Sequence, residues 1–156
     1  MTTDSVQLAK ENKNNPHFTA QDATREGEAL IARSAIALVG SINPQGFPCI
    51  KAMLKMETEG IKSAWFSTNT SSKRVAQFLS NPKASVYFVD EQNFKGLLLV
   101  GEMQVLQDKK SKKRLWREGF EVYYPQGVSD PDYTVLCFTA KTANYYHGLQ
   151  NITFDV

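Results

Sequence analysis

The sequence is poor in the residues that mark metal-binding, membrane and disulfide-rich proteins. Of its 156 residues two are cysteines and two are histidines, and neither pair has the spacing of a metal site. It contains no run of about 18 apolar residues, and its polar N-terminus lacks the apolar core of a signal peptide. These absences predict a cytoplasmic protein with no bound metal and no membrane span, in which Cys49 and Cys137 stay buried and reduced.

Glycine motifs and an excess of one charge are also missing. The nine glycines never fall at the spacing of a Rossmann fingerprint, a P-loop or a nucleophile elbow. The net charge is +2, from 18 basic and 16 acidic residues. This balance does not favour a protein that binds nucleic acid, whose basic residues usually dominate one face. Any anion site must therefore be local.

The composition is that of a folded protein, with 42% hydrophobic and 22% charged residues. Residues 1–18 are rich in Asn, Lys and Thr, contain Pro16 and show weak periodicity, so we expect a flexible N-terminal arm. Residues 19–156 have the length of a single domain.

The apolar periodicity predicts a mainly β fold with a few helices. The expected strands are 35–42, 48–56, 61–68, 84–90, 96–107 and 133–146. The expected helices are 19–33, a helix from about 72 to 80, and 109–118. Short turns join the first three strands into an expected antiparallel meander, and Gly101 inside a long strand indicates a bulge. The pattern favours a barrel of about six antiparallel strands.

The stretch 65–74, WFSTNTSSKR, holds the candidate binding site. An apolar strand ends there, and Ser71 or Ser72 can cap a helix that buries Val75, Phe78 and Leu79. Lys73 and Arg74 then fall in the first helical turn, where cations are unfavourable unless an anion is present. Backbone amides, hydroxyls and two cations at one helix start favour a phosphate site. The alternative is an ordinary capped helix with solvated charges.

Lys51 is expected to join this site. In the strand 48–56, Ile50, Ala52 and Leu54 alternate with Lys51 and Met53. If this strand pairs with 61–68 through a short turn, its start lies opposite the end of its partner. We therefore expect Lys51 close to Thr68.

A resemblance is carried by several motifs in a fixed order. They are INPQGFP at 42–48, KAML at 51–54, WFSTNTSSKR at 65–74, NPKA at 81–84, VGE at 100–102, YPQG at 124–127, DPD at 130–132 and NYY at 144–146. Together they resemble the pyridoxamine 5'-phosphate oxidase superfamily, and within it the general-stress-protein branch.

The resemblance implies an FMN-binding split β-barrel that works as a homodimer, with the flavin between the subunits. By position, Lys51, Ser72, Lys73 and Arg74 would hold the phosphate. The isoalloxazine would lie along three further residues, and one more falls where the family usually has a Trp near the flavin; these are Met53, Leu54, Thr68 and Tyr146.

Two departures from the family pattern bear on the reaction. Gly96 stands where the oxidases have a glutamine, and the Arg-Leu-His-Asp-Arg motif that grips flavin and pyridoxal phosphate is absent after Gly148. True pyridoxamine 5'-phosphate oxidation is therefore not expected. The resemblance favours a flavin-dependent oxidoreductase that transfers electrons or hydride to a small substrate, with NAD(P)H as a candidate donor.

Several alternatives stay open. No side chain stands out as a general acid or base, so a non-catalytic flavin-binding or storage stress protein fits the same residues. Haem ligated by His147 and a deazaflavin cofactor are further alternatives. A β-barrel that binds single-stranded nucleic acid is not favoured, since the basic residues are scattered.

Overall fold

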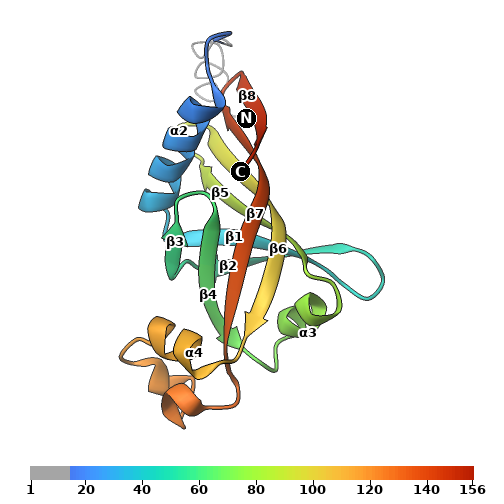
Figure 1. Cartoon of the computed structure of the whole chain (residues 1–156), viewed down its shortest axis with the longest axis vertical. Coiled ribbons are helices and arrows are strands. Elements are labelled where there is room, and N and C mark those ends of the chain that lie inside the picture. The colour runs from blue at the N-terminus through green and yellow to red at the C-terminus, as the bar shows by residue number, and fades with distance from the viewer. Residues whose placement is uncertain (1–14) are drawn as a thin grey trace.

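The computed structural model describes residues 15–156 and shows a curled antiparallel sheet that forms a half-barrel with three α-helices (Figure 1). Its strands are β1 (Ile36–Ile42), β2 (Pro48–Leu54), β3 (Glu57–Glu59), β4 (Ser63–Asn69), β5 (Lys83–Asp90), β6 (Lys95–Leu106), β7 (Tyr133–His147) and β8 (Gln150–Asp155). The helices are α2 (Ala20–Arg33), α3 (Lys73–Ser80) and α4 (Lys109–Leu115), followed by the 3-10 turns η1 (Phe120–Val122) and η2 (Gly127–Ser129). The mainly β, antiparallel class is as predicted.

The order of the strands differs from the predicted meander. They run β2-β1-β5-β6-β7-β4-β3, and β8 pairs with β7. The expected pairing of strand 61–68 with strand 48–56 is wrong, because β4 pairs with β7 in a register that places Phe66 opposite Leu136. The predicted count of about six strands is also too low. The sequence pattern missed β3, which it assigned to a turn, and β8.

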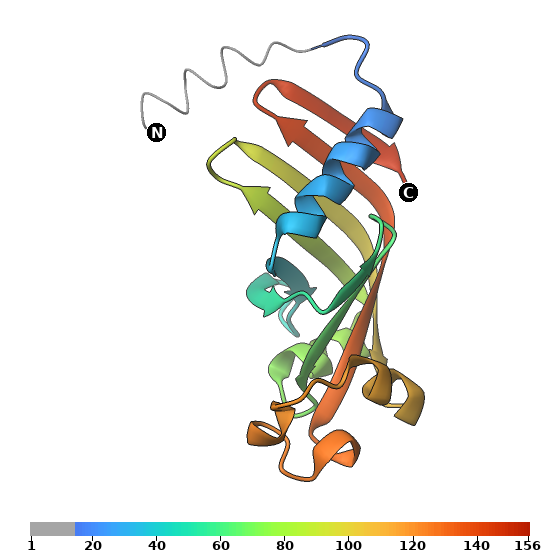
Figure 2. The same ribbon diagram turned by 90° about the vertical axis from the view of Figure 1, so that its left-hand side faces the viewer.

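Helix α2 lies across the hollow of the curled sheet (Figure 2). Thr19 and Asp22 form a capping box at its start, and it buries Ala23, Leu30 and Ile31, which the periodicity places on the inner face. Ala29, predicted for the same face, is instead exposed. Residues 1–14 of the predicted arm lie outside the described part of the chain. Residues 15–18 are described, and the ring of Phe18 stacks on that of Tyr145 with 5.9 Å between centroids.

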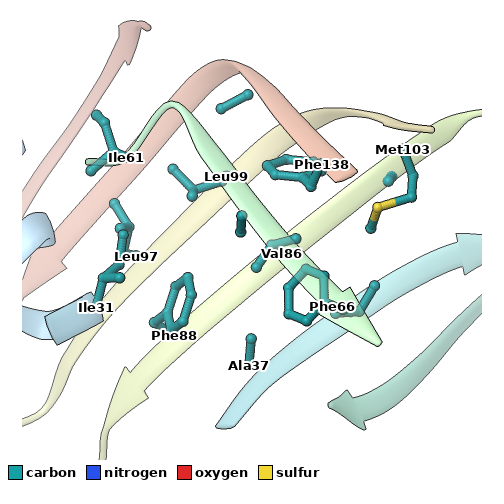
Figure 3. Close-up of a cluster of buried hydrophobic side chains, with 14 of the residues drawn as sticks. Ile31, Ala37, Ile61, Phe66, Val86, Phe88, Leu97, Leu99, Met103 and Phe138 are labelled. Carbon is teal, nitrogen blue, oxygen red and sulfur yellow. The ribbon is translucent and has the colours of Figure 1, made fainter. Parts of the chain in front are cut away.

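The main core fills the inside of the curl. Figure 3 shows Phe66, Val86, Phe88, Leu97 and Phe138 converging from four strands beneath α2. A second, aromatic cluster lies at the far end, where α4 and the chain up to β7 cover the ends of β4 and β7. Its buried members are Leu115, Tyr124, Tyr133 and Val135.

The predicted bulge at Gly101 is confirmed. The register of β6 against β7 shifts between Val100 and Gly101, and a Cβ on Gly101 would collide with the carbonyl of Thr139. The extra residue is Lys141 of β7, because Val100 pairs with Thr142 and Gly101 with Ala140, and such a bulge bends its strand and increases the local twist. Gly101 therefore makes a close backbone approach that no larger residue fits.

The outer face of β1 and β2 is apolar yet exposed. The alternation predicted for β2 is correct, but Met53 points into the core with 6% exposure while Ile50 on the other face is 70% exposed. Cys49 and Cys137 are both free, and each is half-buried where full burial was expected. Within residues 15–156, every helix is too short or too polar to traverse a bilayer.

Candidate functional site

A cleft opens where the ends of β2 and β4 meet the start of α3 and the segment after α4. Its volume is about 290 Å³. The lining residues are Ala52, Met53, Leu54, Met56, Ser67, Thr68, Asn69, Arg74, Phe120, Tyr123 and Tyr124. One part of the wall is aliphatic, another is aromatic, and a single cation lies among them.

Arg74 is that cation, and its guanidinium is only partly satisfied. Its Nη1 donates to the Thr68 hydroxyl at 3.2 Å, while its buried Nε has no hydrogen-bond partner among the described residues. No carboxylate in residues 15–156 forms an ion pair with it. Burial lowers the pKa of Arg74, although a guanidinium stays charged at neutral pH. A half-buried cation without a counter-ion loses part of its hydration, and an anionic ligand would offset that loss.

Helix α3 brings Arg74 to the cleft. Ser72 caps it by accepting a hydrogen bond from the Val75 amide at 3.3 Å, and the first turn contains no acidic residue. Val75 and Phe78 are buried as expected. Leu79, expected on the same buried face, is instead 70% exposed. The helix thus starts as predicted, but its buried apolar face is narrower than predicted, since it lacks Leu79.

The turn before α3 already holds an anion from the chain itself. The Asp132 carboxylate accepts hydrogen bonds from the Ser71 amide at 2.8 Å and from the Asn69 side chain at 2.9 Å. These bonds, that of Asn69 foremost, lower the pKa of Asp132. The backbone therefore offers fewer free donors than the sequence predicted, and Arg74 is the one cation of residues 15–156 that lines the cleft.

The predicted site residues do not all line one cleft. Met53, Leu54, Thr68 and Arg74 line the one cleft. Lys73 instead lines a neighbouring cleft of about 840 Å³ between α3 and the β1–β2 hairpin.

Ser72 serves as the cap beside the cleft, and Lys51 is exposed on β2, where it pairs with Val39. Lys51 was expected close to Thr68 because their two strands were expected to pair. This pairing is wrong, because β2 and β4 are not neighbours in the sheet.

Tyr146 lies near the opposite end of β7. Thr68 pairs with Thr134, and the 12 residues from Thr134 to Tyr146 span about 40 Å along the strand. The Tyr146 hydroxyl is 2.8 Å from that of Tyr87, and both rings lie over Gly96. Burial, followed by the bond to Tyr146, raises the pKa of Tyr87 well above its usual range. Within a single chain, Tyr146 does not belong to the cleft.

The two histidines lie outside this cleft. Burial and the nearby Lys95 ammonium lower the pKa of His147, which is half-buried at the end of β7. In the part of the chain that the structure describes, no group of three His, Cys, Asp or Glu side chains could hold a metal ion.

Sequence reasoning missed the aromatic part of the cleft wall. The YPQG motif at 124–127 is local to this segment, and nothing in it indicates that Phe120, Tyr123 and Tyr124 line the same cleft as Arg74. The Asp-Pro-Asp motif at 130–132 was the available signal, since Asp132 and Pro131 bind the turn before α3.

Solved structures support the fold. A protein from Clostridium acetobutylicum related to general stress protein 26 of Bacillus subtilis, of the pyridoxinephosphate oxidase family, is 46% identical, with a TM-score of 0.80 over 88% of this chain and 97% of that one. General stress protein 26 from Bacillus anthracis is 14% identical (TM-score 0.68, covering 84% of this chain and 98% of that one). A heme-binding protein from Mycobacterium smegmatis is 12% identical (TM-score 0.69, covering 85% and 57%).

Sequence comparison gives the family. No protein of curated function matches the chain. The sequence model of the family described as "Pyridoxamine 5'-phosphate oxidase like" matches residues 22–154. The protein therefore belongs to the pyridoxamine 5'-phosphate oxidase-like family.

Proposed function

We propose that the protein binds FMN and acts as a flavin-dependent oxidoreductase on a small substrate in the cytoplasm. The observation that carries this proposal is the half-buried guanidinium of Arg74, whose buried Nε has no partner among the described residues and which lines a cleft with apolar and aromatic walls. A phosphate would supply the missing acceptor, because an arginine binds phosphate through charge-assisted hydrogen bonds.

The residues present fit this cofactor. Arg74 would hold the phosphate beside the Ser72 cap, while Met53, Leu54 and Thr68 would line the flavin. Lys73 and Lys51 would add a positive field from outside the cleft. When bound, FMN supplies electron or hydride transfer, and the protein supplies position and electrostatics. No residue of the cleft stands out as a proton donor, which is compatible with simple electron transfer.

A second copy of the chain would complete the site. At about 290 Å³ the cleft is at the lower limit of pockets that enclose a whole cofactor. The outer sheet face offers a self-complementary apolar surface in which Ile36 pairs with Leu54, Leu38 with Ala52 and Gly40 with Ile50. A two-fold dimer through this face would bring Tyr87 and Tyr146 of one copy towards the cleft of the other. We infer a homodimer with the flavin between subunits.

A flavin-binding or storage protein without turnover is the second candidate, because the cleft explains binding and lacks an evident acid or base. Haem remains a candidate ligand because one structural neighbour binds heme. True pyridoxamine 5'-phosphate oxidation is not proposed, since Gly96 is overlaid by two tyrosine rings and leaves no room for the glutamine side chain of the oxidases.

The decisive experiment is titration of flavin-free protein with FMN and with riboflavin. We expect one FMN per chain and much weaker riboflavin binding, because the phosphate contacts contribute about 1.5–3 kcal/mol each. Absence of FMN binding at tens of micromolar would refute the proposal. The absorption spectrum of the purified protein separates flavin from haem, and oxidation of NADPH or NADH with a panel of acceptors separates an oxidoreductase from a storage protein.

A further inference from the structure

We propose that the segment between α4 and β7 forms an aromatic wall of the cleft, in which Tyr123 stacks on a flat ring of the bound ligand. This inference rests on the proposed function, because it concerns the same cleft. It adds the chemical class that the cleft selects, namely a planar conjugated ring linked to an anionic group. It also names Tyr123 as the residue that determines this selection.

The position of Tyr123 is the first support. Its side chain lines the cleft together with Phe120 and Tyr124, and Arg74 lines the same cleft. Tyr123 is 71% exposed. Single exposed aromatic residues are common on protein surfaces and need no explanation. An exposed aromatic ring that shares a small cleft with a half-buried cation is a different situation, because the faces of the ring have no parallel partner and the Nε of Arg74 has no acceptor among the described residues.

Among residues 15–156, the ring of Tyr123 has an edge-on aromatic contact and no parallel stacking partner. Its one aromatic neighbour in residues 15–156 is Tyr124, at 6.4 Å between centroids and an interplanar angle of 61°. Tyr124 is itself buried against Tyr133, with centroids 4.9 Å apart. The edge-on contact holds the Tyr123 ring while leaving its faces without a parallel partner. A flat ligand ring can supply that partner in an offset stack.

The wall is fixed relative to the anion-binding residue. Thr70 donates its amide to the Asp132 carbonyl at 2.7 Å and its hydroxyl to the Pro131 carbonyl at 2.9 Å. The buried Lys112 ammonium donates to the Asp130 carbonyl at 2.8 Å, which ties the end of the segment to α4. The turn that leads into α3 and the aromatic segment are therefore one unit. The cleft presents its cation and its aromatic surface at a set spacing.

The test uses the whole protein, freed of flavin, as wild type and three variants. Tyr123→Ala removes the ring, Tyr123→Phe keeps it, and Val122→Ala is the matched control because Val122 is adjacent, 81% exposed and outside the cleft lining. Calorimetric titration with FMN and with 2-naphthyl phosphate measures affinity, and the fluorescence of bound FMN reports stacking. We expect Tyr123→Ala to weaken both ligands about tenfold and to reduce flavin quenching. Tyr123→Phe and Val122→Ala should resemble wild type.

The outcomes separate this inference from the proposed function. If wild type binds FMN and Tyr123→Ala binds it equally well with equal quenching, the stacking role of Tyr123 is refuted. The proposal that the protein binds FMN would then still hold. If wild type does not bind FMN, the proposed function fails, and 2-naphthyl phosphate decides the wall alone. A loss of naphthyl phosphate affinity in Tyr123→Ala would then support it. Equal affinity in all four proteins, or no binding by any, would refute it.

Discussion

The carboxylate of Asp132 accepts a hydrogen bond from the backbone amide of Ser71, with 2.8 Å between the two heavy atoms. The contact joins residues 61 positions apart and fastens the aromatic segment to the start of α3. It also places a chain carboxylate in the turn where the sequence alone predicted a fully open phosphate cradle. The turn therefore has fewer free donors for a phosphate than the motif indicates, and the proposed anion site would depend mainly on Arg74.

The Asp132 contact predicts a pH dependence of stability. Hydrogen bonds from Asn69 and Ser71 lower the pKa of Asp132, so its contribution is present above the unfolded pKa and is lost as the pH falls through the folded pKa. Asp132→Asn should lower the melting temperature at neutral pH, and the difference from wild type should shrink in acid. Thermal unfolding of both proteins from pH 7 to pH 3 measures this. A constant difference across that range would show that ionisation of Asp132 is not involved.

Arg74 and Lys73 should behave differently, although the sequence alone predicted that they act together. Arg74→Gln removes the cation of the cleft and should weaken FMN binding about ten- to a hundredfold. The melting temperature of the flavin-free protein should stay unchanged or rise slightly, because a half-buried charge without a counter-ion in the described residues is removed. Lys73→Gln should change FMN affinity much less, since Lys73 lines the neighbouring cleft. Titration of both variants with FMN compares them, and equal losses would argue for a shared phosphate site.

The dimer proposal predicts the effect of a charge on the outer sheet face. Ile50→Lys places an ammonium in the centre of the apolar surface of β1 and β2 and should shift the protein to a monomer, because burying that charge without a partner is costly. Light scattering of the flavin-free protein measures the mass. Val122→Lys, at an equally exposed position on the aromatic segment, is the control. A wild-type protein that is already monomeric with flavin bound would contradict the proposal.

Gly96 should not tolerate a side chain. A Cβ at this position would collide with the Tyr87 hydroxyl and with the Tyr146 ring. Gly96→Ala should therefore destabilise the fold by about 1–3 kcal/mol, the usual cost of overpacking. In a Tyr87→Phe background the cost should be smaller, because one of the two colliding groups is gone. Denaturant unfolding of the two single variants and the double variant gives the coupling energy, and simple additivity would exclude this contact as the cause.

Much of the local structure follows from short-range sequence patterns. The helix from Thr19 to Arg33, the 43–46 turn between β1 and β2, the Ser72 helix start and the Gly101 bulge were all predicted and are confirmed. Each depends on side chains within a few residues, or on a backbone conformation that few residue types adopt. The mainly β class and the family follow from the same patterns, read in order along the chain.

Strand order and the composition of the cleft required the tertiary structure. The pairing of Phe66 with Leu136 depends on contacts between residues 70 positions apart, which no local pattern specifies. Alternation in β2 shows that Ile50 and Met53 lie on opposite faces, but only the tertiary packing, which puts the core on the Met53 side of the sheet, decides which face is buried.

The division of the predicted site has one local cause and one long-range cause. Residues adjacent in sequence at a helix start, Lys73 and Arg74, point into different clefts because consecutive side chains on a helix are about 100° apart. Tyr123 and Arg74 share a cleft because the chain folds back between α4 and β7. The sequence by itself determined the helix start, its cap and its cations, while the fold decided which of those cations lines the cleft and which side chains surround it.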